Sequence, residues 1–101
     1  MRGDTYYVDF DRIKQHGGYV YYWGLDDYLK PLTGGDLSSK LYIQGDCKMF
    51  RLKVLSLLFY KESMGQGTAY SMTPPDKWDY PSPGSSMEAE LKHVCDFVKN
   101  R

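Results

Sequence analysis

The stretch SSKLYIQGDCKMFRLKVLSLLFY, residues 38–60, decides the fold of this chain. It predicts one strand over 38–45, which stops or bulges at Gly45, and a second strand over 49–62. One phase of the second strand is mostly apolar and contains Phe50, Leu52, Val54, Leu58 and Tyr60. The other phase begins charged and becomes apolar later, which is typical of a central antiparallel strand whose second face meets another layer or another subunit.

The flanking sequence predicts three more strands and a crossover. Strands are expected over 4–10, 19–30 and 67–73, where aromatic and β-branched residues are bounded by turn residues. Within 19–30 we expect the almost wholly apolar phase to be the covered one, and it contains Tyr19, Tyr21, Trp23, Leu25 and Leu29. Residues 74–85 hold four of the five prolines and predict an irregular crossover.

One helix is expected, over 86–99. Ser85 and Glu88 have the spacing of a capping box. Apolar residues then recur at helical intervals, at Met87, Leu91, Val94, Cys95 and Val98. This stripe must pack on the sheet. The sequence therefore predicts a single α+β domain over 1–101, an antiparallel sheet with one C-terminal helix.

The overall charge excludes several classes of partner. Thirteen basic residues balance thirteen acidic ones, so no global field attracts nucleic acid or an anionic membrane, and no nucleic-acid role is expected. The middle third is locally basic, and it has two interpretations. An ordinary solvated strand face is the favoured one; the other is a docking surface for an acidic partner, with Lys40, Lys48, Arg51 and Lys53 as candidate residues. No run is long and apolar enough to span a bilayer.

The two cysteines, Cys47 and Cys95, have three competing interpretations. Nothing places a histidine base beside Cys47, so a nucleophile is disfavoured. A metal site is disfavoured because His93 and Cys95 lie about 200° apart around the helix axis. A disulfide needs only that Cys47 faces the apolar side of the helix, and it fits best, although two buried free thiols remain an alternative. No metal site, cofactor or catalytic constellation is predicted.

A disulfide in a small sheet protein indicates export to the periplasm or the cell surface. The first ten residues lack the apolar core of a signal peptide, so we expect any leader to lie outside the sequence given. The tripeptide RGD at 2–4 resembles an integrin-binding motif, but it precedes a strand at a chain end, and coincidence is the better interpretation.

Several stretches together resemble the surface-adhesin protein E family of Gram-negative bacteria. They are TYYVDFDRI, the long stretch from residue 38 to the G-x-G turn, PPDKWDYPSPGSS and the terminal HVC. The resemblance implies five or six antiparallel strands with the helix on the concave face and a Cys47–Cys95 disulfide. It also implies export, a lipid anchor in some members, a homodimer, and vitronectin, laminin and plasminogen as partners.

Three functional hypotheses follow, of which the weakest is an enzyme with an unrecognised site. The first is an exported envelope or surface protein that binds other proteins without catalysis, with Tyr22 and Trp23 added to the basic candidate residues. The alternative is a periplasmic module that binds a small ligand in a cavity lined by Tyr22, Trp23 and Tyr28, since aromatic faces suit both kinds of partner.

Overall fold

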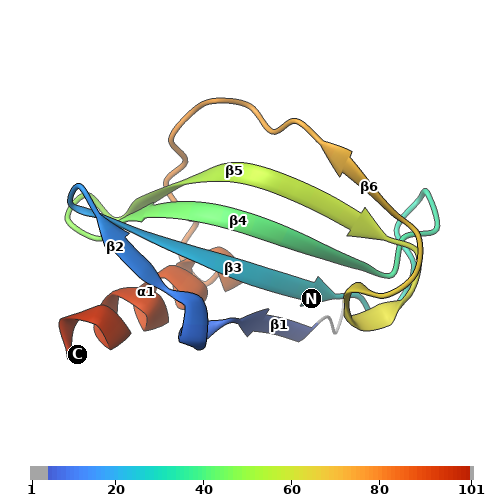
Figure 1. Ribbon diagram of the computed structural model, residues 1–101, viewed down its shortest axis with the longest axis horizontal. Coiled ribbons are helices and arrows are strands. Elements are labelled where there is room, and N and C mark those ends of the chain that lie inside the picture. Colours follow the sequence, from blue (N-terminus) through green and yellow to red (C-terminus); the bar gives the residue numbers. More distant parts are fainter. Residues whose placement is uncertain (1–4, 101) are drawn as a thin grey trace.

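The computed structural model describes residues 5–100, and the RGD tripeptide and the start of the predicted strand 4–10 lie outside them. Within this range the chain forms six strands, two short 3-10 helices and one α-helix (Figure 1). The strands are β1 Thr5–Val8, β2 Lys14–His16, β3 Tyr19–Asp27, β4 Ser38–Asp46, β5 Arg51–Tyr60 and β6 Ala69–Met72; the helices are η1 Phe10–Arg12, η2 Ser63–Gly65 and α1 Ser86–Lys99.

All six strands form one antiparallel sheet. The order across it is β1-β3-β4-β5-β6, and β2 pairs with β3 next to β1. The long strands β3, β4 and β5 lie side by side at the centre, while β1 and β2 follow one another along one edge (Figure 1). The predicted fold class, an antiparallel sheet with one C-terminal helix tied by a disulfide, is confirmed.

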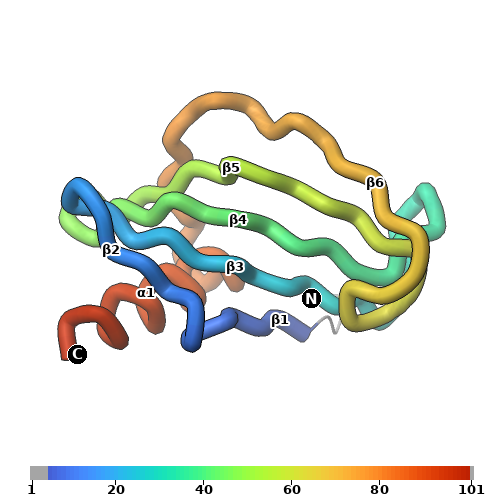
Figure 2. Tube along the Cα trace, in the orientation of Figure 1, coloured from blue at the N-terminus to red at the C-terminus, as the bar shows by residue number. Residues whose placement is uncertain are grey.

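The helix α1 packs on one face of the sheet and covers only part of it. It lies behind the end that holds β2 and the β4–β5 turn, and it does not extend behind β6 (Figure 2). The core is formed where helix and sheet meet, by Ile13, Val20, Tyr22, Ile43, Leu52, Leu91 and Val94. These residues remove apolar surface from water, which is the main term that stabilises so small a domain.

The predicted covered phase of β3 is wrong. The buried residues are Val20 and Tyr22, whereas Trp23 lies on the opposite face. The phase with Tyr19, Tyr21 and Trp23 has more apolar residues, but the helix packs against the phase whose side chains leave room for it. Small residues, Gly24 on β3 and Gly45 on β4, lie on the helix side and let α1 approach, and the ring of Tyr22 lies beside Gly45.

Gly45 neither stops β4 nor causes a bulge, because β4 continues to Asp46. A Cβ atom built on Gly45 would lie 2.9 Å from Leu91 Cδ1 and 2.9 Å from Val20 Cγ2. Any side chain here would push the helix from the sheet, so glycine is required for close packing and not for a turn.

The bulge lies on β5. Tyr42 pairs with Ser56 and Ile43 pairs with Val54, which leaves Leu55 without a partner on β4. Beyond Leu55 the alternation of side chains is shifted by one residue, so that odd-numbered residues take the face that even-numbered residues had before it. Leu57 therefore points to the helix side, as Leu52 and Val54 do. The expectation that Leu52, Val54, Leu58 and Tyr60 share one face is therefore wrong, and the bulge accounts for the two apolar phases.

Two other elements differ from the sequence expectation. Residues 14–16, which lie outside every strand that the sequence predicts, form β2, which pairs with β3 after a turn at Gly17 and Gly18. β3 ends at Asp27 and not at residue 30, because the loop that follows begins by hydrogen bonding from Tyr28 N to Leu37 O at 2.9 Å.

The helix begins where its cap predicts. The Ser85 side chain accepts a hydrogen bond from Glu88 N at 3.2 Å. The Glu88 carboxylate accepts one from Gly84 N at 2.9 Å, one residue before the usual capping-box donor.

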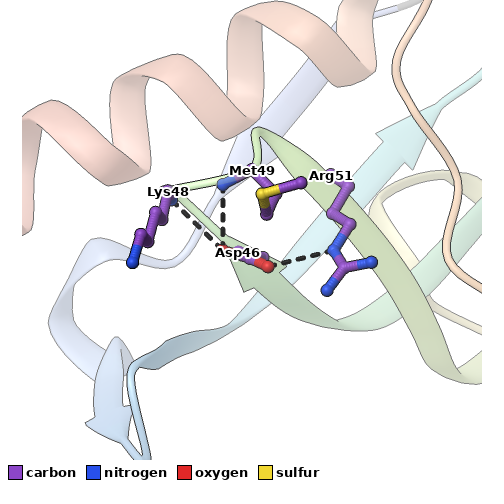
Figure 3. A network of polar contacts seen from close by, with 4 residues as sticks. All are labelled: Asp46, Lys48, Met49 and Arg51. Carbon is purple, nitrogen blue, oxygen red and sulfur yellow. Dashed lines mark hydrogen bonds and ion pairs between the residues drawn. The ribbon is translucent and has the colours of Figure 1, made fainter.

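The turn between β4 and β5 places Cys47 against the helix. Asp46 Oδ1 accepts hydrogen bonds from Lys48 N at 3.2 Å and from Met49 N at 3.1 Å, while Asp46 Oδ2 pairs with Arg51 Nε at 3.0 Å (Figure 3). Burial raises the pKa of Asp46, but these donors outweigh it and hold that pKa below its ordinary value. The tight turn directs Cys47 toward α1.

The Cys47–Cys95 disulfide is confirmed, with the two Cα atoms 5.7 Å apart. It joins the β4–β5 turn to the third turn of α1, on the apolar side of that helix. The alternative of two buried free thiols is therefore wrong, because both cysteines are bonded to each other. The bridge closes a loop over a sequence separation of 48 residues.

Reduction is expected to lower the free energy of unfolding substantially. Loop-closure entropy predicts a loss of about 4 kcal/mol for a loop of this length, close to the whole stability of a small domain. Urea denaturation with and without reductant, and of a Cys47→Ala/Cys95→Ala variant, measures the loss. Equal midpoints for all three samples would contradict this role.

A carboxyl group is buried under the same helix. Glu90 on α1 is 8 % exposed and faces β3, 3.4 Å from a Cβ built on Gly24. Burial, together with the charge of Asp26, raises the pKa of Glu90 to about 8. Tyr22 on β3 is the other titratable group that interacts with Glu90, and Tyr6 and His93 line the groove beside it. At neutral pH the folded protein therefore holds Glu90 mostly protonated.

This shift predicts that stability falls as pH rises. The unfolded chain loses the Glu90 proton near pH 4.5 whereas the folded protein keeps it until about pH 8. Between these values the folded state binds more protons, so the free energy of unfolding drops by up to about 1.4 kcal/mol per pH unit. Glu90→Gln should flatten this slope and be more stable than the wild type at pH 8 by chemical denaturation. The exposed control Glu62→Gln should keep the wild-type slope, and equal slopes for Glu90→Gln and the wild type would refute the assignment.

Candidate functional site

The sheet face opposite α1, which we call the open face, is the candidate functional surface. Its residues follow from the strand register, since paired residues share a face. β3 contributes Tyr19, Tyr21, Trp23 and Leu25; β4 contributes Lys40, Tyr42 and Gln44; β5 contributes Arg51, Lys53, Ser56, Leu58 and Tyr60. In the part of the chain that the structure describes, no α-helix covers this face, and the 3-10 helix η2 packs over one end of it at Leu25 and Lys40 (Figure 1).

Aromatic rings form a continuous row across β3 and β4. The Trp23 ring lies 4.8 Å from the Tyr42 ring, and the Tyr21 ring stacks on Tyr42 at 6.3 Å, both measured between centroids. Gln44 Nε2 donates a hydrogen bond to Tyr21 Oη at 3.1 Å and fixes the end of the row. These rings are half-buried, so they present flat apolar surface at little entropic cost.

The crossover places a second tryptophan on the open face. Residues Leu52 and Asp79 pair through two backbone hydrogen bonds, of 2.9 Å and 2.7 Å, so the crossover runs along the start of β5. Trp78 points the other way from Asp79 and its ring lies 5.4 Å from Tyr19. Trp78 therefore pins the crossover to the open face.

Basic side chains lie on these rings. Arg51 Cζ is 4.3 Å and Lys53 Nζ 4.9 Å from the Trp78 centroid, and Lys40 Nζ is 5.3 Å from the Tyr60 centroid. Arg51 also pairs with Asp46, whose hydrogen bond raises the pKa of the Arg51 guanidinium and keeps it charged. Lys53 pairs at 3.1 Å with Asp76, whose side chain is 91 % exposed.

The open face is hollowed on its β1 side. A groove of about 490 Å³ lies beside β1, with Trp23, Leu25 and Leu58 among its apolar lining and Lys40 and Arg12 among its charged lining. The η2 turn lies close to the Lys40 stem, because a Cβ built on Gly65 would come within 2.7 Å of Lys40 Cε. Met64 N donates a hydrogen bond to Asp27 Oδ1 at 2.7 Å and holds this turn in place.

The structure brings together most of the sequence-derived candidates. Lys40, Arg51, Lys53 and Trp23 all lie on the open face. Lys48 does not, because it lies in the exposed β4–β5 turn. Tyr22 is fully buried under α1, so it cannot contact a partner. The prediction that Tyr22 belongs to the binding surface is therefore wrong.

The three rings of the small-ligand hypothesis do not share a cavity. Tyr22 points to the helix side and Trp23 to the open face, because neighbouring strand residues alternate. Tyr28 follows β3, and its hydroxyl hydrogen bonds to Ser39 Oγ at 2.6 Å.

Sequence reasoning missed the larger part of this surface. Tyr19, Tyr21, Tyr42, Tyr60 and Trp78 were not among the candidates, although five aromatic residues are too many for one layer of a small core. The signal that could have found Tyr42 is Lys40, which lies two residues earlier in the same strand phase, because a buried face would not tolerate a lysine there.

The open face presents groups that can stack on, pair with and hydrogen bond to another molecule. Its groups are aromatic rings, ammonium and guanidinium cations and side-chain amides. Within residues 5–100 no cluster of three or more histidine, cysteine, aspartate or glutamate residues could hold a metal ion. Within the same range no helix has the length and apolarity needed to cross a membrane.

Comparison with solved structures identifies the fold. Crystal form II of Haemophilus influenzae protein E aligns with a TM-score of 0.71 at 19% identity, over 90% of this chain and 80% of that one. Another structure of Haemophilus influenzae protein E gives a TM-score of 0.70 at 16% identity, over 95% and 80% of the two chains. Protein E from non-typeable Haemophilus influenzae gives 0.65 at 17% identity, over 94% and 71%.

Comparison with curated protein sequences found no match. A family model does match, however, and it describes surface-adhesin protein E and covers residues 1–96, nearly the whole chain. The sequence resemblance, the disulfide-tied fold and the family match agree. The chain belongs to the surface-adhesin protein E family.

Proposed function

We propose that this protein is an exported bacterial surface adhesin that binds other proteins through the open face and performs no catalysis. The observation that supports the proposal best is the combination of half-buried aromatic rings with basic side chains stacked on them, as in Trp78 with Arg51 and Lys53. Tryptophan, tyrosine and arginine are the residues that contribute most to binding energy at protein interfaces.

The location on the envelope is part of the same proposal. A disulfide that carries much of the stability needs an oxidising compartment, which is the periplasm or the outer surface of the cell. The family is named for surface proteins, which favours the outer surface. A lipid anchor would lie outside the described residues.

Host matrix and serum proteins are the proposed partners. Vitronectin, laminin and plasminogen are the partners that the family resemblance implies, and the basic groups of the open face suit acidic segments of such proteins. The small-ligand alternative loses support because Tyr22 and Trp23 lie on opposite faces.

Charge reversal on the open face should weaken partner binding. Lys53→Glu places a carboxylate beside Trp78 and Asp76, and we expect the response to immobilised vitronectin, laminin or plasminogen to fall by about three- to tenfold in surface plasmon resonance. Lys92→Glu, on the exposed side of α1, is the matched control and should bind as the wild type does. Flat wild-type responses to all three proteins at micromolar concentration would reject this choice of partners.

Dimerisation is a further part of the proposal, and exposed apolar residues on β5 and β6 support it. Beyond the reach of α1, the helix side of the sheet exposes a row of apolar residues across β5 and β6, where Phe59 stacks on Tyr70 at 5.6 Å and Met72 is 52 % exposed. We propose that a second copy of the chain covers this row, because exposed apolar surface on an edge strand favours association.

The dimer is tested by substituting a single residue of that row. Met72→Glu should convert a dimer into a monomer in light scattering, because a carboxylate would be buried in the interface. Met49→Glu changes a methionine of equal exposure, 53 %, in the β4–β5 turn and should leave the mass unchanged. A wild-type chain that is monomeric at high concentration would contradict the proposal.

A further inference from the structure

The groove on the open face contains Lys40, a cation for which the described residues provide no anionic partner. Within residues 5–100, no carboxylate lies within ion-pair distance of Lys40 Nζ, whereas Arg51, Lys53 and Lys61 each have one. Lys40 is half-buried, and its ammonium group contacts the Tyr60 ring at 5.3 Å. Partial removal from water without a counter-charge is unfavourable, so the site is complementary to an anion.

The stem of Lys40 is held in place by its surroundings. Leu25 on β3 and Leu58 on β5 are its direct cross-strand neighbours. The η2 turn packs close to Lys40 Cε at Gly65, where φ is +69° and the position is therefore suited to glycine. Since its flexible stem is confined, Lys40 loses less entropy on binding than a free surface lysine does.

The groove pairs this cation with an apolar floor. Tyr7, Trp23, Leu25 and Leu58 contribute apolar surface to the same hollow as the Lys40 side chain. A ring or a branched side chain of a partner would stack on Trp23 and remove that surface from water.

The charge of the groove selects a single carboxylate. Asp9 and Arg12 also line it, and Arg12 Nε lies 3.5 Å from Asp9 Oδ2. Because these two charges offset one another, the net charge of the groove is the single positive charge of Lys40. A phosphorylated side chain carries nearly two negative charges, and a basic segment would be repelled. A single carboxylate therefore matches the net positive charge of the groove.

We propose that this groove binds a partner segment in which a carboxylate lies next to an aromatic or branched apolar side chain, with the carboxylate on Lys40 and the side chain on Trp23. The inference rests on the proposed function, since it assigns the partner chemistry recognised in a groove of the same open face. The carboxylate could belong to an acidic side chain or to the end of the partner chain, and both offer the same group.

Peptide titrations followed by proton–nitrogen correlation NMR test this inference. The probe is acetyl-Gly-Glu-Phe-Gly-amide, with Gln replacing Glu or Ala replacing Phe as matched controls. We expect saturable shifts of the Trp23 indole N–H with a millimolar dissociation constant, and binding weaker by about five- to tenfold for each control peptide. Acetyl-Gly-Gly-Phe with a free carboxylate distinguishes a chain end from a side chain.

Variants of the protein separate the charge from the fold. Lys40→Met keeps the apolar stem and should lose about five- to tenfold in affinity, whereas Lys40→Arg should restore most of it. Lys48→Met, outside the open face, is the control and should bind as the wild type does. Equal binding of the Gln peptide, shifts that map outside the groove, or an unchanged affinity for Lys40→Met would each overturn the assignment.

The outcome is separable from that of the proposed function. If the peptides do not bind but the whole protein binds a host protein in a manner that depends on Lys53, then the groove inference is wrong and the adhesin proposal stands. If the peptides bind through Lys40 but host proteins do not bind the open face, then the groove is a binding site and the adhesin proposal is wrong.

Discussion

The contact between α1 and the sheet at Gly45 determines the rest of this structure. Leu91 comes close enough to the sheet to be fully buried because Gly45 has no side chain, and the Cys47–Cys95 bridge ties the following turn of the helix to the β4–β5 turn. A domain of this size has few other buried apolar residues, and all seven core residues lie at or near this contact. Loss of the contact would remove the core as a whole.

The same contact explains why the other face of the sheet is available for binding. One helix can cover only one face, and η1, η2 and the crossover pack at the borders of the second. The open face is therefore built on strands whose positions are fixed by the core beneath them. Because a rigid sheet holds the rings of Trp23 and Tyr42, binding there would need little reordering of the protein.

The fold was predictable where local chemistry decides the structure. Ser85 and Glu88 are three residues apart and hydrogen bond to one another. Their spacing therefore locates the start of the helix, and the tertiary fold is not needed for this prediction. The disulfide was the best of several interpretations of the cysteines because Cys95 lies in the apolar stripe of the helix, which must face the sheet. The binding surface was less predictable. Tyr22 and Trp23 are both large and aromatic, and only the space between α1 and the sheet determines which of them is buried.

The β-bulge at Leu55 affects how this chain should be compared with its relatives. Periodic patterns and residue-by-residue alignments assume that inside and outside alternate without interruption, and one unpaired residue in β5 reverses that assignment for everything from Ser56 to Tyr60. A family member that lacked the extra residue would present the chemical groups of its core where this chain presents its contact surface. Transfer of binding residues between members is therefore sound only after the bulge has been located in each.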